Sequence, residues 1–269
     1  MERKINVKIL NKSILLLCIF IFAFPFVSNA AAKTTTASIN IRLNQYYVLY
    51  TTPTSPYIDN GRLYLPLRSV SELLGAQVGY VSDSKTADIS FKLNKLVINM
   101  LTQKIAYNGK VIDTELKPQI RQQSIYVPVQ ILIEGLGLNG KWDQQTKILN
   151  IQEESVKNLE LFQLASEFDK VSIISEDTFL PLSFTLETGA SNGHNKMKLS
   201  VKAKNISGHA IPEGQEDLHP TYFISSGVTL ETLDRKRPAI KKDEIFTRQW
   251  ERTMNQSLQY ILIEGRTIQ

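Results

Sequence analysis

The residue types best suited to chemistry gather in one part of the chain. His194, His209 and His219 are its only histidines, and Glu216 and Asp217 lie just before the last of them. Imidazole and carboxylate groups bind zinc or copper and also act as general acids and bases. However, the i, i+10 spacing of the last two histidines, in a segment with Gly and Pro, matches no ligand motif. The sequence therefore predicts an ordinary polar loop here and no metal site.

A cluster of positive charge follows the histidines. Its members are Arg235, Lys236, Arg237, Lys241 and Lys242. Asp243 and Glu244 offset it in part. The cluster is typical of a solvated loop, and it also suits electrostatic contact with the anionic polymers of a cell wall. We take these five residues as the candidate polymer-contact site, and we expect that replacing them with Gln leaves the fold intact.

Recognised catalytic motifs are absent from the sequence, which has no Gly-x-Ser-x-Gly elbow, His-Glu-x-x-His pair, P-loop or dinucleotide fingerprint. The single cysteine, Cys18, lies in an apolar N-terminal segment, so the chain beyond it has no thiol for catalysis or metal binding. We therefore expect that the protein is not an enzyme and that it has no catalytic residue, cofactor or metal. Two alternatives stay open: a secreted hydrolase with its site around His209 and His219, and a protease-inhibitor-like or regulatory ectodomain.

Residues 1–30 have the pattern of a secretory signal peptide. Four basic side chains precede an apolar run from Ile14 to Phe24, which is shorter than the roughly 20 residues of a membrane-spanning helix. Cleavage after Ala30 leaves a chain with a net charge of +2 and no membrane span, and this small charge does not indicate nucleic-acid binding. We expect a secreted protein associated with a Gram-positive cell wall. An uncleaved anchor and a lipoprotein at Cys18 are the alternatives.

An internal repeat organises residues 39–151. A displacement of 62 residues aligns residues 56–91 with residues 118–153 without a gap and with nine identities. In each copy a β-rich run leads to a proline, an apolar helical stripe and a glycine, which are the start and stop signals of a short helix. The identical pairs are Pro56/Pro118, Ile58/Ile120, Tyr64/Tyr126, Pro66/Pro128, Glu72/Glu134, Leu74/Leu136, Gly75/Gly137, Lys85/Lys147 and Ile89/Ile151.

Each copy predicts three strands, a helix and two further strands, which together favour an antiparallel sheet with a helix laid across it. The first strand after each helix ends in an aromatic residue, Tyr80 or Trp142. Arg68, Glu72 and Glu134 are predicted to lie on a solvated helix face, with ligand contact as the alternative. The side chains expected to be buried beneath the helices are Leu67, Val70, Leu74, Val129, Leu132 and Leu136.

These two copies, "NGRLYLPLRSVSELLGAQVGY" and "SIYVPVQILIEGLGLNGKWDQQTKILNI", resemble the two halves of the copper amine oxidase N-terminal-like domain, also called the stalk domain. The resemblance covers residues 38–152, with repeats at about 38–91 and 95–152. It implies a binding or spacing module that lies apart from the oxidase's catalytic barrel. It brings no copper chemistry, because the repeats contain no histidine and the chain has no Asn-Tyr dipeptide for a quinone.

The rest of the chain predicts a linker helix over residues 153–178 and a β-sandwich over residues 179–269. The segment "KLSVKAKNISGHAI" resembles a strand and corner of small immunoglobulin-like domains. Strands are expected at Pro181–Glu187, Met197–Lys204, Thr221–Ser225, Val228–Leu233 and Leu258–Glu264.

The predicted fold class is therefore α+β: a duplicated sheet-plus-helix module, a connecting helix and a sandwich. The predicted function is that of an exported, non-catalytic protein of the cell envelope, which binds or spaces. Its expected partner is a cell-wall glycan or an anionic wall polymer, and no nucleic acid.

Overall fold

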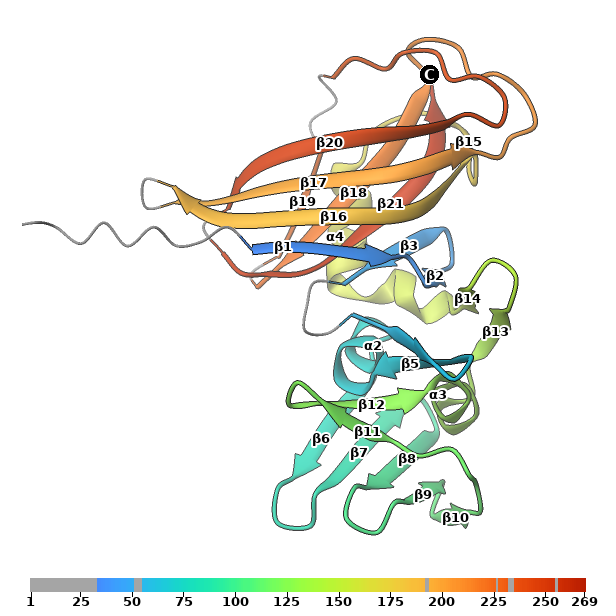
Figure 1. Ribbon diagram of the computed structural model, residues 1–269, viewed down its shortest axis with the longest axis vertical. Coiled ribbons are helices and arrows are strands. Elements are labelled where there is room, and N and C mark those ends of the chain that lie inside the picture. The colour runs from blue at the N-terminus through green and yellow to red at the C-terminus, as the bar shows by residue number, and fades with distance from the viewer. Residues whose placement is uncertain (1–32, 51–54, 192–193, 226, 232–234, 255) are drawn as a thin grey trace, which may run out of the picture. The chain divides into compact units, whose positions relative to one another are not determined.

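Two β-rich regions follow one another along the chain in the computed structural model (Figure 1). The part of the chain that the structure describes comprises residues 33–50, 55–191, 194–225, 227–231, 235–254 and 256–269. The predicted signal peptide, residues 1–30, lies outside it. None of the described helices is long and apolar enough to cross a membrane. Strands dominate more than the predicted α+β class implies, because the three described helices are short.

The first repeat folds as its sequence predicts. Its elements are β4 (Tyr57–Asp59), β5 (Arg62–Pro66), α2 (Leu67–Leu73), β6 (Gln77–Val81) and β7 (Thr86–Phe91). Proline's fixed φ suits the residue before a helix, and α2 begins directly after Pro66. The helix is followed by Gly75 at a φ of +84°, the left-handed conformation in which many helices end.

The second repeat has the same elements in the same order. They are β11 (Gln119–Arg121), β12 (Ser124–Pro128), α3 (Val129–Leu136), β13 (Asn139–Asp143) and β14 (Ile148–Gln152). Gly137 at a φ of +63° ends α3 as Gly75 ends α2. Three strands connect the repeats: β8 (Asn94–Asn99), β9 (Lys104–Tyr107) and β10 (Lys110–Ile112). Strands β9 and β10 form a hairpin around Asn108-Gly109, both of which have the positive φ that a tight turn requires.

An approximate twofold axis relates the two repeats. Strands β5 and β12 pair antiparallel, with Leu65 opposite Val127 at the centre. On one side of that pair Tyr64 lies opposite Pro128, and on the other Tyr126 lies opposite Pro66. Tyr64 corresponds to Tyr126 and Pro66 to Pro128, so the pairing is symmetric about Leu65 and Val127. The central sheet has the order β11-β12-β5-β4, and the sheet beside it has the order β10-β9-β8-β7-β6.

One apolar core joins both repeats. Five of the six side chains predicted to be buried beneath the helices are buried, namely Leu67, Val70, Leu74, Leu132 and Leu136. Val129 is only partly buried, contrary to the prediction, because it forms the wall of a pocket described below.

The C-terminal region, residues 179–269, contributes long strands to two sheets that enclose a second core. These strands are β16 (Phe179–Ser191), β17 (His194–Asn205), β18 (Glu216–Ile224), β19 (Gly227–Leu230), β20 (Ile245–Met254) and β21 (Leu258–Ile268). Strand β20 was not predicted from the sequence. Its inward positions alternate Phe246, Trp250 and Met254 with two arginines, and this mixture hides the usual period of apolar residues.

Strands from both regions share a sheet. The strands before the first repeat are β1 (Lys33–Ser38), β2 (Ile41–Leu43) and β3 (Tyr46–Leu49), and β15 (Ile173–Ser175) precedes the C-terminal region. The eight-stranded sheet has the order β13-β14-β2-β3-β21-β18-β19, with β15 also paired to β21. Strand β1 pairs with β16 in a separate sheet of order β1-β16-β17-β20. The predicted boundaries at residues 152 and 179 thus separate strands that the structure joins by hydrogen bonds.

The segment between the two regions contains less helix than the sequence predicts. A 3₁₀ turn, η1 (Glu154–Asn158), and helix α4 (Glu160–Phe168) occupy the predicted linker helix of residues 153–178. Leu159 separates them with an extended ψ of 135°. Phe162 of α4 packs on Tyr46 and Phe223, so this helix contacts strands from both regions.

Candidate functional site

The five basic residues of the predicted polymer-contact site do not share one surface. Lys236, Lys241 and Lys242 are exposed, as the prediction requires. The side chains of Arg235 and Arg237 are only 15% and 8% exposed and turn inward. The expectation that all five could be replaced without harm to the fold is therefore corrected: these two guanidinium groups neutralise buried acids.

Strand β18 supplies those acids. Glu216 accepts hydrogen bonds from Arg235 Nη1 at 2.7 Å and from Arg248 Nε at 2.9 Å. Asp217 accepts from Arg266 Nε at 2.8 Å and from Arg237 Nη2 at 3.1 Å. Burial alone would raise the pKa of Glu216, but hydrogen bonds and the charges of Arg235 and Arg248 outweigh it and the pKa is lowered. The carboxylate of Glu216 is therefore held ionised in the protein interior.

Arg266 of β21 connects this network to Asp169 at the end of α4. Its side chain is 2% exposed and also forms a two-pronged ion pair with Asp169, with Nη2 and Oδ1 3.0 Å apart. Burial opposes ionisation of Asp169, yet this pairing lowers its pKa. Glu264 lies nearby, but burial dominates there and raises the pKa of its carboxyl to about 7.

The predicted polar loop around the histidines is correct for His209, which is exposed, and wrong for His219. His219 lies in β18 and is 2% exposed, because the strand pairs along its length with β21 in the middle of a sheet. Burial lowers the pKa of His219 to about 4, so its ring is neutral at pH 7. Its Nδ1 lies 3.7 Å from Asp217 Oδ2, which is beyond hydrogen-bond distance.

His219, Asp217 and Glu231 have ligand atoms within 4.8 Å of one another, a spacing that a metal ion could bridge. Arginines already occupy this space. Both oxygens of Asp217 accept from guanidinium groups, and Arg235 Nε lies 2.7 Å from Glu231 Oε1. Positive charge at this distance opposes a divalent cation, so the residues present do not fit a metal site.

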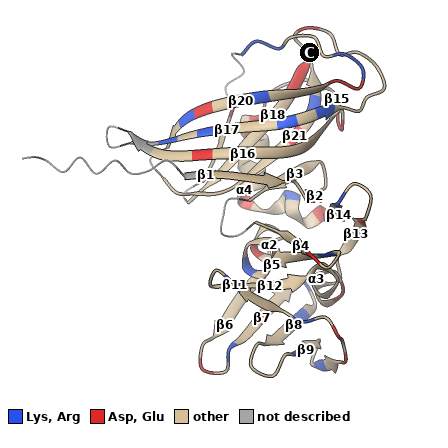
Figure 2. Ribbon diagram, viewed as in Figure 1, with Lys and Arg blue, Asp and Glu red and all other residues tan. Residues whose placement is uncertain are grey.

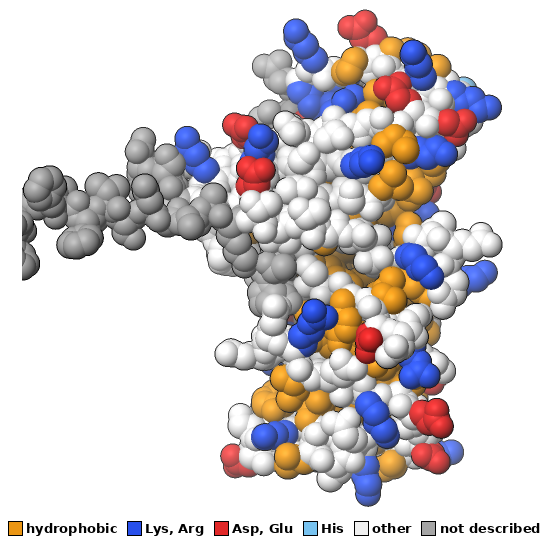
Figure 3. Space-filling view, in the orientation of Figure 1, with side chains coloured by type: hydrophobic (Ala, Val, Ile, Leu, Met, Phe, Trp, Pro, Cys, Tyr) orange, Lys and Arg blue, Asp and Glu red, His pale blue; other side chains and the backbone are white. Residues whose placement is uncertain are grey.

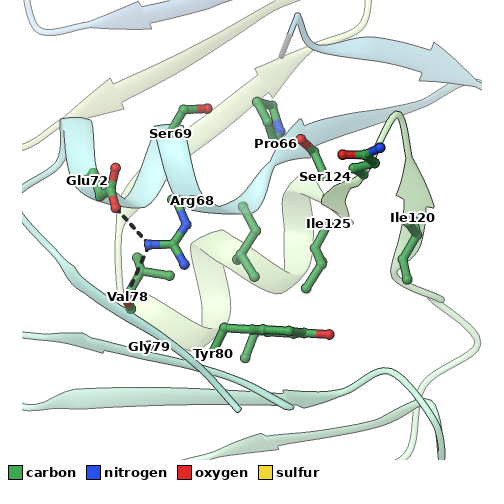
Figure 4. A pocket seen from close by; sticks show the side chains of 13 residues that line it. Pro66, Arg68, Ser69, Glu72, Val78, Gly79, Tyr80, Ile120, Ser124 and Ile125 are labelled. Atoms are coloured by element: carbon green, nitrogen blue, oxygen red, sulfur yellow. Dashed lines mark hydrogen bonds and ion pairs between the residues drawn. The ribbon is translucent and has the colours of Figure 1, made fainter. Parts of the chain in front are cut away.

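A second candidate site lies in the repeat region (Figure 4). Helix α2, strand β6 and the β11–β12 turn surround a pocket of about 340 Å³. Its walls are mostly apolar, and they include Leu67, Val78 and Ile125. At its rim Tyr80 is 43% exposed and Ile120 is 60% exposed. In Figure 4 the Tyr80 ring is seen edge-on along one wall, with Ile125 across the pocket from it.

One ion pair supplies the charged groups of this pocket. Arg68 Nη1 donates to Glu72 Oε1 at 3.2 Å and to the Val78 carbonyl at 3.5 Å (Figure 4). Both side chains are more than half exposed, so they are available to a ligand. The pair carries no net charge. Arg68 and Glu72 thus lie on a solvated helix face, as predicted, and that face also borders a pocket. The repeat pattern predicted an aromatic residue at Tyr80 but not that its side chain would be exposed.

Charge is not segregated on the described surface. Lysines and arginines recur along β17 and β20, and acidic residues lie in β16 and β20 (Figure 2). The space-filling view shows hydrophobic, basic and acidic side chains interspersed over the repeat region (Figure 3). A field of one sign that would select a strongly charged partner is therefore not a feature of this face.

Comparison with known families identifies the domain that the repeat region forms. The copper amine oxidase N-terminal domain family matches residues 42–151. The chain therefore carries this non-catalytic module, and β16 to β21 form an additional β region that the match does not name. No curated protein and no solved structure matches the chain.

Proposed function

We propose that this protein is exported to the cell envelope and binds a neutral, hydroxyl-rich wall glycan through the repeat region, without catalysis. The observation that carries the proposal is the pocket between α2, β6 and the β11–β12 turn, with its exposed Tyr80. Small binding sites are typically concave and apolar, with a few polar groups that orient the ligand, and this pocket has that composition.

The ligand class follows from the chemistry of the pocket. A sugar ring presents an apolar face of C–H groups, which packs on an aromatic ring such as Tyr80, and a rim of hydroxyl groups. Glu72 can accept hydrogen bonds from such hydroxyls, and Arg68 can donate to them. Because Arg68 and Glu72 neutralise each other, the pocket favours a neutral glycan over an anionic polymer.

Contact with anionic wall polymers remains a secondary proposal. Of the five residues first considered, Lys236, Lys241 and Lys242 are exposed and could contribute. Attraction through three exposed lysines would be screened by salt over about 8–10 Å. The main proposal includes three further expectations for the protein. Its signal peptide is cleaved, it is located at a Gram-positive cell envelope, and its C-terminal region is immunoglobulin-like.

The test is retention of the mature protein, residues 31–269, on purified insoluble peptidoglycan from which anionic polymers have been removed. We expect retention by the unaltered protein and a loss of roughly tenfold with Tyr80→Ala, since a stacked aromatic contact contributes on the order of 1 kcal/mol or more. Leu101→Ala is the matched control, because Leu101 is also a large exposed hydrophobic side chain but lies outside the pocket.

Three results would count against this function. Equal retention of the Tyr80→Ala and control variants would show that the pocket does not bind the glycan. Release of soluble fragments from the wall would favour the hydrolase alternative, with His219 as the first residue to replace. Capture of a protease with no affinity for the wall would favour the inhibitor alternative.

A further inference from the structure

A second pocket, of about 320 Å³, lies beside the helix of the second repeat. Helix α3, strand β13 and the β4–β5 turn contribute to it, and these elements correspond to α2, β6 and the β11–β12 turn in the first repeat. Eight positions of the first pocket recur 62 residues away. The corresponding pairs are Pro66/Pro128, Leu67/Val129, Arg68/Gln130, Glu72/Glu134, Tyr80/Trp142, Gln123/Gly61, Ser124/Arg62 and Ile125/Leu63.

The pairing of β5 with β12 explains why there are two pockets. Each helix follows one of these central strands, and the twofold axis through the Leu65/Val127 pair places it beside the hairpin of the other repeat. Each pocket therefore needs both repeats, one for its helix and aromatic wall and the other for its turn. Duplication of the sequence thus duplicates the pocket as well as the fold.

The groups that would contact a ligand are also duplicated. Each pocket has one aromatic side chain, Tyr80 or Trp142, at the same point of the strand after the helix. Each has a helix glutamate whose partner lies four residues earlier. Glu134 Oε1 accepts from Gln130 Nε2 at 2.7 Å, in the place of the Arg68–Glu72 pair. In both pockets the carboxylate is exposed. Its partner differs between the pockets, and so does the aromatic residue, because Tyr80 is exposed whereas Trp142 is half-buried.

The charge of the second pocket also selects a neutral ligand. Glu134 is its only acidic lining residue and Arg62 its only basic one. An anionic polymer would meet an exposed carboxylate in each pocket, whereas a neutral glycan offers hydroxyl and amide groups to both. The two pockets therefore fit the same class of ligand.

We propose that the two pockets are equivalent subsites for a neutral glycan, so that the module is bivalent. This inference rests on the proposed function, which requires only the Tyr80 pocket. A twofold axis reverses any direction that runs across it, so a directional polymer that lies across the axis in one subsite would run the opposite way through the other. The module would therefore engage two antiparallel glycan chains and hold them together. Engagement at two points raises retention on an insoluble polymer far above that of either site.

Calorimetric titration of the mature protein with soluble N-acetylglucosamine tetramers tests the number of sites. We expect two sites per chain, one in Tyr80→Ala, one in Trp142→Ala and none in the double variant. On insoluble glycan, retention of the double variant should fall at least roughly tenfold below that of either single variant.

Matched substitutions separate binding from folding. Trp142→Tyr installs the aromatic residue of the first repeat and should keep both sites, as should Tyr80→Trp. In a Trp250→Phe background Trp142 is the only tryptophan, so its fluorescence should change on titration even in Tyr80→Ala. Thermal unfolding of every variant provides the control for folding.

The outcomes distinguish this inference from the proposed function. A single site that Tyr80→Ala abolishes and Trp142→Ala leaves intact would overturn bivalency and keep the proposed function. An extended peptide that binds along the exposed edge of β6, with no response to the sugar, would overturn both. Absence of binding by the tetramer and by insoluble glycan would also overturn both.

Discussion

The repeat region and the C-terminal region are both built mainly from antiparallel strands, yet they bury different kinds of side chain. Among the described residues from 39 to 151, every fully buried polar side chain is uncharged, as Asn44 and Ser71 illustrate. The C-terminal region buries Glu216, Asp217, Glu264 and Arg266. The repeat region thus keeps its charged groups at the surface, where they border two pockets. The C-terminal region uses charged groups to join β18 and β21 to the segments around them.

This difference teaches where function and stability reside in the chain. Charged groups that pair in the interior stabilise little in net terms, but the loss of one partner leaves another charge buried and unpaired. Exposed pairs such as Arg68–Glu72 contribute little to stability and are available to a ligand. The same residue types therefore have opposite roles in the two regions.

The largest expected effect comes from Arg266. Arg266→Ala leaves Asp217 and Asp169 without their strongest partner in the interior, and we expect it to lower the free energy of unfolding by about 3–5 kcal/mol. Arg68→Ala removes the same residue type from an exposed pair and should lower it by at most about 1 kcal/mol. Urea unfolding measures both. Equal effects would remove the distinction between the regions.

Truncation of the apolar core should affect both repeats alike. Leu74 and Leu136 are corresponding residues and are almost completely buried. Replacement of either by Ala removes buried methyl groups and leaves a cavity, which should destabilise the protein by about 2–5 kcal/mol. Urea unfolding should give similar values for the two variants. A large loss for one and none for the other would mean that the repeats are not structurally equivalent.

The pH dependence of stability should arise in the C-terminal region, from two opposing groups. The pKa of His219 falls from 6.5 to about 4 on folding, so this group makes stability decrease as pH falls through that range. The pKa of Glu264 rises from 4.5 to about 7, so this group makes stability decrease as pH rises through that range. Between pH 5 and 6.5 the two effects should nearly cancel.

Single variants should expose each effect. With Glu264→Gln the remaining His219 should make stability rise with pH, and with His219→Gln the remaining Glu264 should make it fall, each by about 1.4 kcal/mol per pH unit. Urea unfolding at several pH values between 5 and 6.5 gives the slopes. Slopes of the same sign in the two variants would contradict the assignment.

The smallest effect is expected for the exposed lysines. Replacement of Lys236, Lys241 and Lys242 by Gln should change the free energy of unfolding by less than about 0.5 kcal/mol, because surface substitutions usually do. It should also reduce any salt-sensitive retention on walls that keep their anionic polymers. Replacement of Arg235 and Arg237 by Gln should instead destabilise the fold. A triple variant with unchanged retention at low salt would end the secondary proposal.

The sequence by itself determined the repeat. Spacing of prolines, apolar residues and glycines predicted both helices, their ends and most of their buried side chains, because local conformation and a single buried face depend on neighbouring residues. It also predicted correctly that Arg68, Glu72 and Glu134 would be exposed. The module family followed from the same positions, and the match to residues 42–151 confirms it.

Only the tertiary structure decided which residues act together. The pairing of β5 with β12 places the helix of one repeat beside the turn of the other, and no local pattern encodes that contact. The sequence does not distinguish the arginines of the basic segment from its lysines. Arg235 and Arg237 nevertheless turn inward, because β18 places carboxylates behind them. Burial of His219 has the same origin, since pairing with β21 covers a strand whose polar composition predicted a loop. A long-range contact sets the environment of a polar side chain, and the environment decides whether that side chain is buried for stability or exposed for binding.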